Sequence, residues 1–371
     1  MTSDPVAGSP TVAGHPGISW SIALDAVLGS ALDRREAQAR LDAAWPGDGR
    51  AGPVPRIDVV DGTAGGFDAV LGDLADRPYA AGEPPCRVVM EAGPPSRMAV
   101  AGHHAVLDGL GLVAVLGAAL GTPLGTTARG AGAPPAPTAG QRLRSVVYPV
   151  GRLGEALLRP PARIAPDRDR PGQSPASRDG DHLVSATVAG HIGTAELVAA
   201  CAGAVAEWNA RRGRRRGRVS VAVGASRRRG ANPEIGREAI WFRVDVDPVM
   251  SADDVRRLLA ARGPEPDQPR AALRAARAAG IAKLLERRTG STLLVSNLGG
   301  LVPEEPVVRA AFYPAAHGRS GVAVGAIRAG QVTTITARAR RSDFTRPAAA
   351  GFLDLVAGRV GGPSSASPPA P

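Results

Sequence analysis

The segment Gly102–Gly109, with the sequence GHHAVLDG, is the stretch of this 371-residue chain that most narrows its fold and chemistry. It places the adjacent histidines His103 and His104 ahead of Asp108 and Gly109, in the pattern HHxxxDG. For a chain of this composition, the pattern is expected by chance in about one sequence in a thousand. It is therefore a candidate catalytic motif, since an imidazole exchanges protons near neutral pH.

Hydrophobic patterns on both sides of this motif predict a strand before it and a helix after it. The apolar run Arg97–Ala101 is joined to Arg87–Glu91 by Ala-Gly-Pro-Pro-Ser, which is typical of a hairpin. The apolar run Gly109–Leu120 predicts a helix. A strand end followed by a helix start would deliver an imidazole into a cleft.

Similar patterns along the chain predict a mixed α/β fold with hairpins rather than a purely parallel sheet. Further strands are predicted at Ile18–Leu24, Arg56–Val60, His182–Val188, Val219–Gly224, Ile240–Val246 and Leu293–Ser296, with a hairpin of Gly321–Arg328 and Gln331–Arg338. Further helices are predicted at Asp33–Trp45, Phe67–Leu74, Thr194–Arg211, Ser251–Ala261, Gln268–Arg288 and Arg346–Val360. Asp33, Thr194 and Ser251 are candidate N-caps.

Polar and proline-rich segments divide the chain into two parts of comparable size. Residues 1–16 and 361–371 are small, polar and rich in proline, and we interpret them as disordered ends. Residues 141–181 contain a proline- and arginine-rich stretch without apolar periodicity, which indicates a linker or crossover. We therefore expect one subdomain over 17–140, carrying the histidine motif, and a second over 182–360.

Composition argues against several other classes of protein. Lys283 is the one lysine among 45 basic residues, so there is no phosphate loop of the GxxxxGK[ST] kind and no motif supporting a pyridoxal phosphate site. Cys86 and Cys201 form no zinc pattern or disulfide framework. The longest apolar run, Leu110–Gly121, is too short to span a membrane, and the first residues do not resemble a signal peptide. We expect a cytoplasmic protein with no membrane span and no bound metal or cofactor.

The motif HHAVLDG and its surroundings resemble the CoA-dependent acyltransferase superfamily. This superfamily includes chloramphenicol acetyltransferase, condensation domains of nonribosomal peptide synthetases, wax-ester synthase/diacylglycerol acyltransferases and mycobacterial polyketide-associated acyltransferases. Further segments similar to superfamily motifs are Asp76–Ala101, Val221–Arg227 (VAVGASR) followed by Ile235-Gly236, and Val295–Gly300 (VSNLGG). The resemblance runs in order through residues 17–360, and HHxxxDG is its one specific motif.

This resemblance implies both a fold class and a reaction. The implied fold is α/β, with two chloramphenicol acetyltransferase-like subdomains that form a V around a central tunnel. The implied donor is an acyl thioester, either acyl-CoA or a phosphopantetheinyl carrier protein, and the acceptor is a small-molecule alcohol or amine. We expect a freestanding acyltransferase that transfers groups other than aminoacyl groups, in specialised or lipid metabolism.

The resemblance also implies roles for the matched residues. His104 is the expected general base, which takes the proton of the attacking hydroxyl or amine, and His103 is mainly positional. Gly109 is expected to let the chain turn tightly into the helix. Ser296 and Asn297 are expected either to shape the tunnel or oxyanion environment, or to form no more than a turn.

Asp108 is implied to be structural and to form an ion pair with a distant arginine. Arg227 is the arginine that best matches the superfamily motif, although the neighbouring Arg228 and Arg229 leave the register open. All three lie in residues 211–229, which hold nine arginines and no acidic residue and so carry +9 of the net charge of +11. This stretch is either an arginine-rich face for CoA phosphates or an acidic carrier protein, or a solvated loop.

Two alternative functions are open. The short chain, and the replacement within Arg237–Trp241 of the asparagine that often follows the Ile-Gly turn, favour a non-transferring homologue that acts as a carrier-protein recruitment module or a cyclase. The basic stretch Arg211–Arg229 suggests nucleic-acid binding, but it has no interleaved aromatic residues for base stacking. We therefore expect no nucleic-acid partner.

Overall fold

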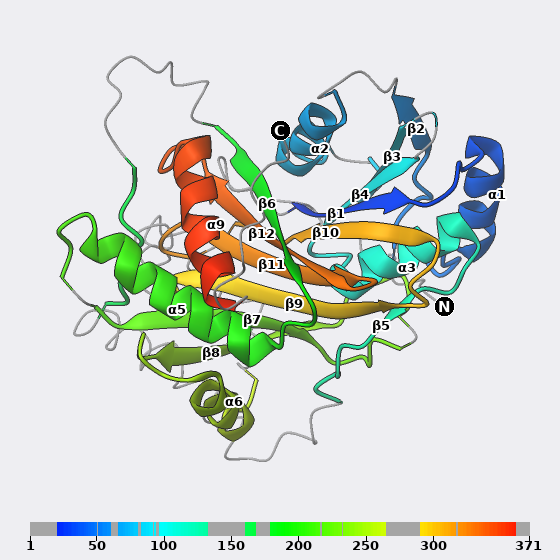
Figure 1. Cartoon of the computed structure of the whole chain (residues 1–371). Helices are drawn as coiled ribbons and strands as arrows, with labels where there is room; N and C mark the ends of the chain where they lie inside the picture. Colours follow the sequence, from blue (N-terminus) through cyan, green and yellow to red (C-terminus); the bar gives the residue numbers. More distant parts are fainter. Residues whose placement is uncertain are drawn as a thin grey trace, which may run out of the picture.

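Two β-sheets, each with helices packed on its faces, make up the architecture (Figure 1). The structure is a computed structural model. It describes residues 21–49, 51–60, 66–80, 83–91, 93, 96–132, 160–167, 179–215, 217–231, 233–264, 290–316 and 318–360. Within these residues the chain is mixed α/β, as the hydrophobic patterns predict.

The first sheet carries the histidine motif. Its strands lie in the order β10 (Val307–Tyr313), β1 (Ser21–Leu28), β4 (Arg97–His103), β3 (Cys86–Glu91) and β2 (Ile57–Val60). All neighbours are antiparallel except β2 and β3. Alternate side chains of β1 face opposite ways. Ile22 and Leu24 pack with α1 (Arg34–Ala44) and α3 (Gly109–Leu120), whereas Ala23 packs with α2 (Gly66–Asp76).

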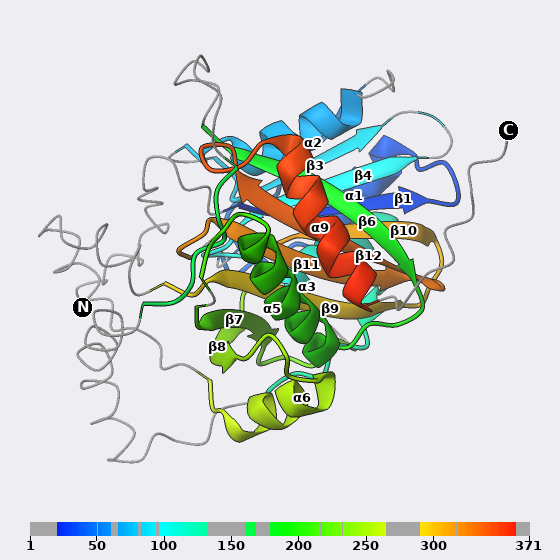
Figure 2. The same cartoon turned by 60° about the vertical axis from the view of Figure 1, so that its left-hand side comes forward.

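The second sheet is larger. Its strands lie in the order β6 (Asp181–Ala189), β12 (Val332–Arg340), β11 (Val322–Ala329), β9 (Leu293–Val302), β7 (Val219–Ser226) and β8 (Ala239–Val246), and the short β5 (Gly125–Thr126) pairs with β9. Strand β9 runs parallel to both β7 and β11. Helices α5 (Thr194–Ala210) and α9 (Arg346–Val360) lie side by side across one face, with α6 (Ala252–Ala261) beside α5 (Figure 2).

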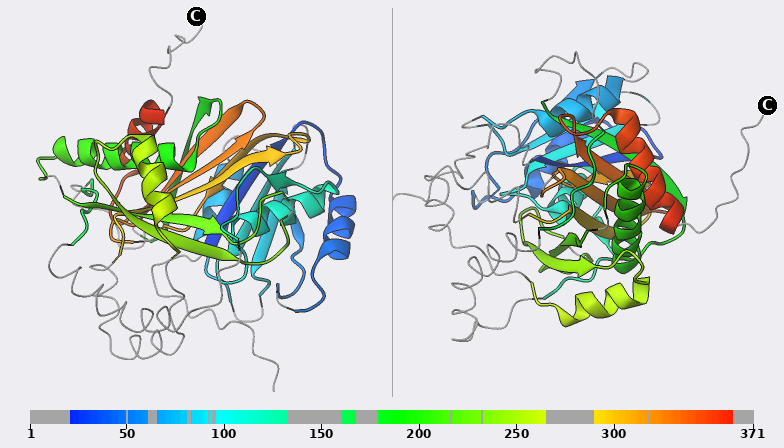
Figure 3. Two further views of the ribbon diagram at one scale, coloured as in Figure 1. Left: turned by 90° about the horizontal axis from the view of Figure 1, so that it is seen from below. Right: turned by 90° about the vertical axis from the view of Figure 1, so that its left-hand side faces the viewer.

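Helix α3 packs between the two sheets. Its residues are apolar around the whole circumference and nearly all of them are buried. One side contacts β1 and β4, and the same apolar cluster includes Leu298 of β9 and Ile327 of β11. An α-helix that is apolar all round is stable in water only when it is enclosed on all sides. Figure 3 shows the resulting layers, with α5 and α9 outside the second sheet and α1 outside the first.

Strands are exchanged between the two halves of the sequence. Strand β10 comes from the second half, yet it pairs with β1 in the first sheet. Strand β5 comes from the first half, yet it pairs with β9 in the second sheet. The sheets are therefore interlocked and do not each come from one half, and the boundaries 17–140 and 182–360 stay predictions.

A buried arginine joins the sheets from the other side. Arg338 of β12 has no exposed surface. Its Nε donates to the Asp181 carboxylate at 2.6 Å, Nη1 to the Ser21 carbonyl at 2.6 Å and Nη2 to the Ala75 carbonyl at 2.9 Å. One guanidinium thereby links the second sheet to β1 and to the end of α2.

Most predicted elements are confirmed where the structure describes them. Helices α3 and α9 have the predicted bounds, and the two hairpins form as β3–β4 and β11–β12. Asp33 and Ser251 cap α1 and α6 as predicted. The N-cap of α5 is Gly193 and not Thr194, because the Glu196 carboxylate reaches back to the Gly193 N–H at 2.9 Å.

Some predicted elements differ from the structure in extent, and one strand was not predicted. The strand predicted at Leu293–Ser296 continues to Val302, and β10 forms where no strand was predicted, despite its β-branched and aromatic residues. The helix predicted at Gln268–Arg288 lies outside the described residues, and so do the first residues of the strand predicted at Ile18–Leu24.

Candidate active site

The histidine motif lies where β4 ends and α3 begins, in the predicted strand–turn–helix arrangement. The His103 backbone N–H donates to the Pro85 carbonyl at 2.7 Å, which fixes the end of the strand. The His103 carbonyl then accepts from the backbone N–H groups of Val106 at 2.9 Å and Leu107 at 3.0 Å. The motif is therefore a tight turn with a defined geometry.

His104 is half-buried and presents one ring nitrogen for chemistry. Its Nδ1 lies 3.0 Å from the Leu107 carbonyl oxygen. A carbonyl can only accept, so Nδ1 carries the proton and Nε2 keeps its lone pair. Burial lowers the pKa of His104, as does the positive charge of Arg237, against the opposing effects of the Leu107 carbonyl and Asp108. The ring is therefore neutral at physiological pH, and Nε2 is free to accept a proton.

His103 is held inside the turn. Its Nδ1 accepts the Ala105 backbone N–H at 3.1 Å, so the ring proton is on Nε2. The ring is 5% exposed and packs edge to face against Tyr79, with centroids 5.5 Å apart. Burial, and then the neighbouring His104, lower the pKa of His103 to about 4. These contacts keep His103 neutral and support the turn that carries His104.

The Asp108 carboxylate is fully engaged in holding the structure. One oxygen accepts the Gly111 N–H at 2.8 Å and caps α3, and the other accepts the Glu238 N–H at 2.8 Å. Arg228 Nη2 lies 3.2 Å from the first oxygen and 3.3 Å from the second. A buried carboxylate with these partners orients the turn and has no oxygen left to act as a base.

The arginine that pairs with Asp108 is Arg228, one residue beyond the expected Arg227. The β7–β8 ladder explains this register. The Arg227 N–H donates to the Glu238 carbonyl at 3.0 Å and continues the strand pairing past Ser226. Arg228 is the next residue, and its side chain turns to the motif. The sequence could not separate neighbouring arginines, because the register depends on where the ladder ends.

Arg228 also ties the turn between β7 and β8 to the motif. Its Nη1 donates to the Glu234 carbonyl at 2.6 Å, and its Nη2 donates to the Gly236 carbonyl at 3.0 Å. The Asp108 backbone N–H donates to the same Gly236 carbonyl at 3.2 Å. We call residues 234–238 the Ile-Gly turn. It lies directly against the start of α3.

Two glycines at the start of α3 are required by close packing. A Cβ on Gly109 would lie 2.6 Å from Leu298 Cδ2 of β9, and a Cβ on Gly111 would lie 2.4 Å from the Gly236 carbonyl oxygen. Gly109 is not among the glycines with positive φ. The expected reason for Gly109, a tight turn, is therefore replaced by a steric one.

Ser296 and Asn297 lie within β9, so the interpretation that they form no more than a turn is wrong. Ser296 is paired with Gly224 of β7 and Gly325 of β11 in the middle of the sheet. The Asn297 amide donates to the Ile192 carbonyl at 2.8 Å and its oxygen accepts the Gly299 N–H at 2.9 Å. The Asn297 side chain is thus used by the fold, and a role in lining a tunnel stays a prediction.

The described arginines of the arginine-rich stretch lie on both sides of a strand in the sequence. Strand β7 divides it, and eight extended residues span about 26 Å. Before the strand, Arg211 pairs with Glu207 and the Arg212 guanidinium stacks 3.3 Å from the Trp208 ring centroid. Arg218 pairs with Asp245 at 2.8 Å as the strand begins. Arg211 and Arg218 are therefore paired with acidic residues, and whether the stretch forms a basic face or a solvated loop stays a prediction.

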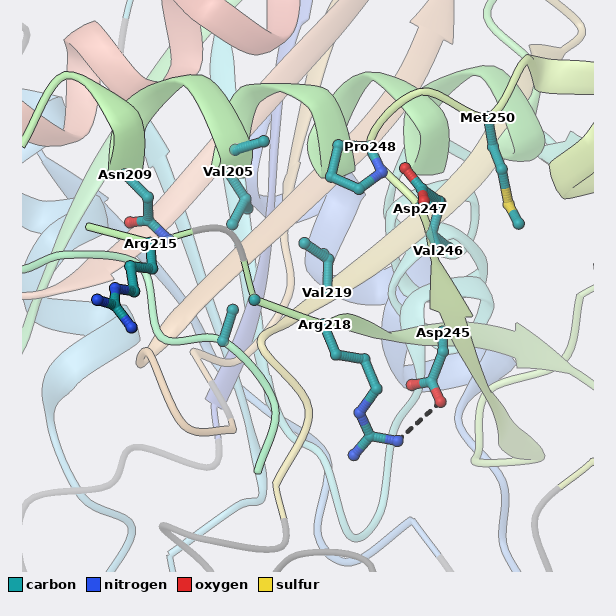
Figure 4. Close-up of a pocket in the computed structure, with 13 residues that line it drawn as sticks. Val205, Asn209, Arg215, Arg218, Val219, Asp245, Val246, Asp247, Pro248 and Met250 are labelled. Atoms are coloured by element: carbon teal, nitrogen blue, oxygen red, sulfur yellow. Dashed lines mark hydrogen bonds and ion pairs between the residues drawn. The ribbon is translucent and has the colours of Figure 1, made fainter. Parts of the chain in front are cut away.

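An open pocket of about 460 Å³ lies at the start of β7, the end opposite Arg228 (Figure 4). Its lining includes Val205 and Asn209 of α5, Val219 of β7 and Met250. The Asn209 side-chain oxygen accepts the Ala165 N–H at 2.8 Å. This pocket is separate from the histidine motif, because no residue of the motif lines it.

Among the described residues, no group of three or more histidine, cysteine, aspartate or glutamate residues could hold a metal ion. No helix in the same part of the chain has the length and apolar character to cross a bilayer.

The chain matches no protein-family model and no curated protein sequence. By structure it is similar to a variant of the starter condensation domain of rhizomide synthetase RzmA in complex with C8-CoA and Leu-SNAC, with a TM-score of 0.58, 13% identity, and coverage of 93% of this chain and 90% of that chain. For the EpoB cyclization-docking bidomain from Sorangium cellulosum, the TM-score is 0.57 at 13% identity, and the match covers 94% of this chain and 80% of that chain. For the condensation domain of the Monacolin K polyketide synthase MokA, the TM-score is 0.51 at 12% identity, and the match covers 92% of this chain and 91% of that chain. The expected α/β fold with two sheets is thus confirmed and matches the fold of condensation domains, whereas the V shape and the tunnel stay predictions.

Proposed function

We propose that this chain, which has the condensation-domain fold of the CoA-dependent acyltransferase superfamily, transfers an acyl group from a thioester to an alcohol or amine. The observation that carries the proposal is the state of His104. Its Nδ1–H is held by the Leu107 carbonyl, its Nε2 is left as an acceptor, and its pKa is lowered. This is the state that a general base needs at neutral pH.

The reaction divides into two proton transfers around one bond exchange. His104 Nε2 takes the proton of the acceptor O–H or N–H as the acceptor atom attacks the thioester carbonyl carbon. The tetrahedral intermediate collapses, the C–S bond breaks, and the imidazolium returns the proton to the leaving thiolate. The products are an ester or amide and a free thiol, and His104 is neutral again.

The donor in this proposal is acyl-CoA or the phosphopantetheinyl thioester of a carrier protein. One structural neighbour is described in complex with C8-CoA, which supports a thioester donor at the level of the fold. A V-shaped arrangement with a tunnel that lets donor and acceptor reach His104 from opposite sides is part of the proposal. The chain itself would need no bound cofactor.

Intact-mass detection of acylated product, across a small panel of acyl-CoA and carrier-bound donors, tests the proposal. His104→Ala is expected to lower turnover by a factor of about 10² to 10⁴. His191→Ala is the matched control, because His191 is an exposed histidine outside the motif. Unchanged turnover in His104→Ala, with the wild-type fold retained by circular dichroism, would exclude His104 as the base.

The alternative is a non-transferring homologue, a carrier-protein recruitment module or a cyclase. It is favoured by the short chain and by the segment Arg237–Trp241, which lacks the asparagine that often follows the Ile-Gly turn in the superfamily. One structural neighbour is a cyclization-docking bidomain, which is compatible with altered chemistry on this fold. Tight carrier-protein binding without acyl transfer from any donor would support this alternative, whereas multiple-turnover acylation would exclude it.

A further inference from the structure

An exposed arginine lies in the Ile-Gly turn, which is hydrogen-bonded to the motif that carries the proposed base. Arg237 is the residue after Gly236 in the Ile-Gly turn, and its charge acts on the His104 ring. Within the part of the chain that the structure describes, its side chain has no hydrogen bond or ion pair. Its exposed neighbours Glu234 and Glu238 form none with it. Among the described residues, the arginine therefore has no direct ion-pair partner.

The backbone of Arg237 is fixed from both sides by the motif. The Gly236 carbonyl before it accepts from the Asp108 N–H at 3.2 Å and from Arg228 Nη2 at 3.0 Å. The Glu238 N–H after it donates to the Asp108 carboxylate at 2.8 Å. Asp108 is adjacent to Leu107, whose carbonyl holds His104. A short chain of hydrogen bonds thus sets the position of Arg237 relative to the proposed base.

We propose that Arg237 binds a free carboxylate of the acceptor and so selects an amino acid or hydroxy acid as the substrate. The inference rests on the proposed acyl transfer at His104. An exposed guanidinium without a partner, held by a rigid backbone, is suited to bidentate carboxylate recognition. Binding the carboxylate would place a nucleophile a few bonds away beside His104 Nε2.

The position of Arg237 favours the acceptor over the donor. In CoA and in a phosphopantetheinyl arm, cysteamine, β-alanine and pantoate units separate the thioester sulfur from the nearest phosphate. With the thioester carbonyl at His104, that phosphate lies a whole pantetheine length away, beyond the reach of an arginine fixed beside the motif. An anion bound by Arg237 would therefore belong to the acceptor.

The bound carboxylate would also change the base. The charged and titratable groups found around His104 are His103, Asp108 and Arg237. A carboxylate on Arg237 offsets the positive charge that disfavours the imidazolium, so proton uptake by His104 becomes easier when the correct acceptor is bound. The arginine would then couple acceptor recognition to base strength.

The test compares matched acceptors in the full chain with octanoyl-CoA as donor. The pairs are L-leucine with L-leucinamide, and 2-hydroxy-4-methylpentanoic acid with its amide. The variants are Arg237→Gln, Arg237→Lys as the charge-retaining form, and Arg229→Gln as a control for loss of an exposed arginine. A further arm replaces octanoyl-CoA by octanoyl-N-acetylcysteamine, which lacks phosphate, and another uses a dicarboxylic acyl-CoA.

We expect Arg237→Gln to raise KM for the acid about 10- to 100-fold and to leave KM for the amide unchanged, with partial rescue in Arg237→Lys. Histidine NMR titration should show a higher pKa for His104 in Arg237→Gln, because a cation has been removed. An equal effect of Arg237→Gln on acid and amide, or an effect that follows donor phosphate or acyl charge, overturns the inference.

Failure of the proposed function gives a different result. If amide acceptors are acylated as well as the acids and the reaction needs His104, acyl transfer is supported and the role of Arg237 is excluded. If no acceptor is acylated, acyl transfer falls. The inference is then decided by thermal shift with leucine and leucinamide: stabilisation by leucine alone, lost in Arg237→Gln, supports it, and equal shifts overturn it.

Discussion

Arg228 and Asp108 form an ion pair across 120 residues of sequence, with Nη2 at 3.2 Å and 3.3 Å from the two carboxylate oxygens. The pair is almost completely buried, with 12% and 4% of the two side chains exposed. It joins the motif of the first sheet to the end of β7 in the second sheet. The position of His104 therefore depends on contacts made by both halves of the chain.

Breaking this pair from either side should be costly. Arg228→Met and Asp108→Asn are each expected to lower the free energy of unfolding by about 3 kcal/mol, because one change leaves a buried charge unpaired. The double variant should lose less than the sum of the two. Urea unfolding measures all three, and Arg229→Gln, at an exposed arginine, should stay within about 0.5 kcal/mol of wild type. Additive losses would show that the two groups do not interact.

The two glycines of α3 should respond differently to alanine. In Gly109→Ala the new methyl meets the tip of Leu298, which can rotate away, whereas in Gly111→Ala it meets the Gly236 carbonyl of the backbone. We expect about 1 kcal/mol lost for the first and about 3 kcal/mol for the second. Gly111→Ala should also lower acyl-transfer turnover, because it displaces the Ile-Gly turn. Equal losses in stability and turnover would contradict the steric argument.

Acyl transfer should persist below the ordinary titration range of histidine. The pKa of His104 is lowered from 6.5, chiefly by burial, so the neutral ring survives as the pH falls through 6.5. The pH profile of kcat/KM reports groups of the free enzyme, and its acidic limb should have a midpoint below 6.5. A midpoint above 6.5 would show that another group limits the reaction or that the site is solvated.

His103 should make the fold less stable in mild acid. Its pKa is about 4 in the folded chain against an ordinary value of 6.5, so the unfolded chain binds the proton first as the pH falls. The contribution is complete above pH 6.5 and is lost progressively towards pH 4, by about 3 kcal/mol in all. Urea unfolding at several pH values should give a flatter slope for His103→Gln. The pKa of Asp76 is raised to about 6, so Asp76 makes the fold more stable as the pH falls. This effect is the same in the wild type and in His103→Gln, and it cancels in the comparison.

The junction at Arg338 should be a major source of stability. Arg338→Met leaves the buried Asp181 carboxylate without its cation and removes the bonds to Ser21 and Ala75. We expect a loss of about 3–5 kcal/mol in urea unfolding. Arg341→Gln, which removes a partly exposed partner of Asp76, should cost less than about 1 kcal/mol. Comparable small losses for both would show that the sheets are held by apolar packing alone.

Local patterns in the sequence predicted much of the secondary structure correctly. The apolar runs at Gly109–Leu120 and Arg346–Val360 give the observed helices, because side-chain periodicity and backbone hydrogen bonding are local properties. The serine cap of α6 was also readable, since its partner is three residues away. Strand β10 was not identified, because its pairing with β1 lies across most of the chain.

The sequence by itself determined the histidine motif, its strand–turn–helix setting and the resemblance to acyltransferases. Only the tertiary structure decided that Arg228 pairs with Asp108, that Gly111 is needed for a backbone contact, and that the backbone on both sides of Arg237 bonds to Asp108. The physical reason is the range of the interactions. Periodicity and capping act over a few residues, whereas burial, ion pairing and the pKa of His104 depend on which distant segments the fold brings together.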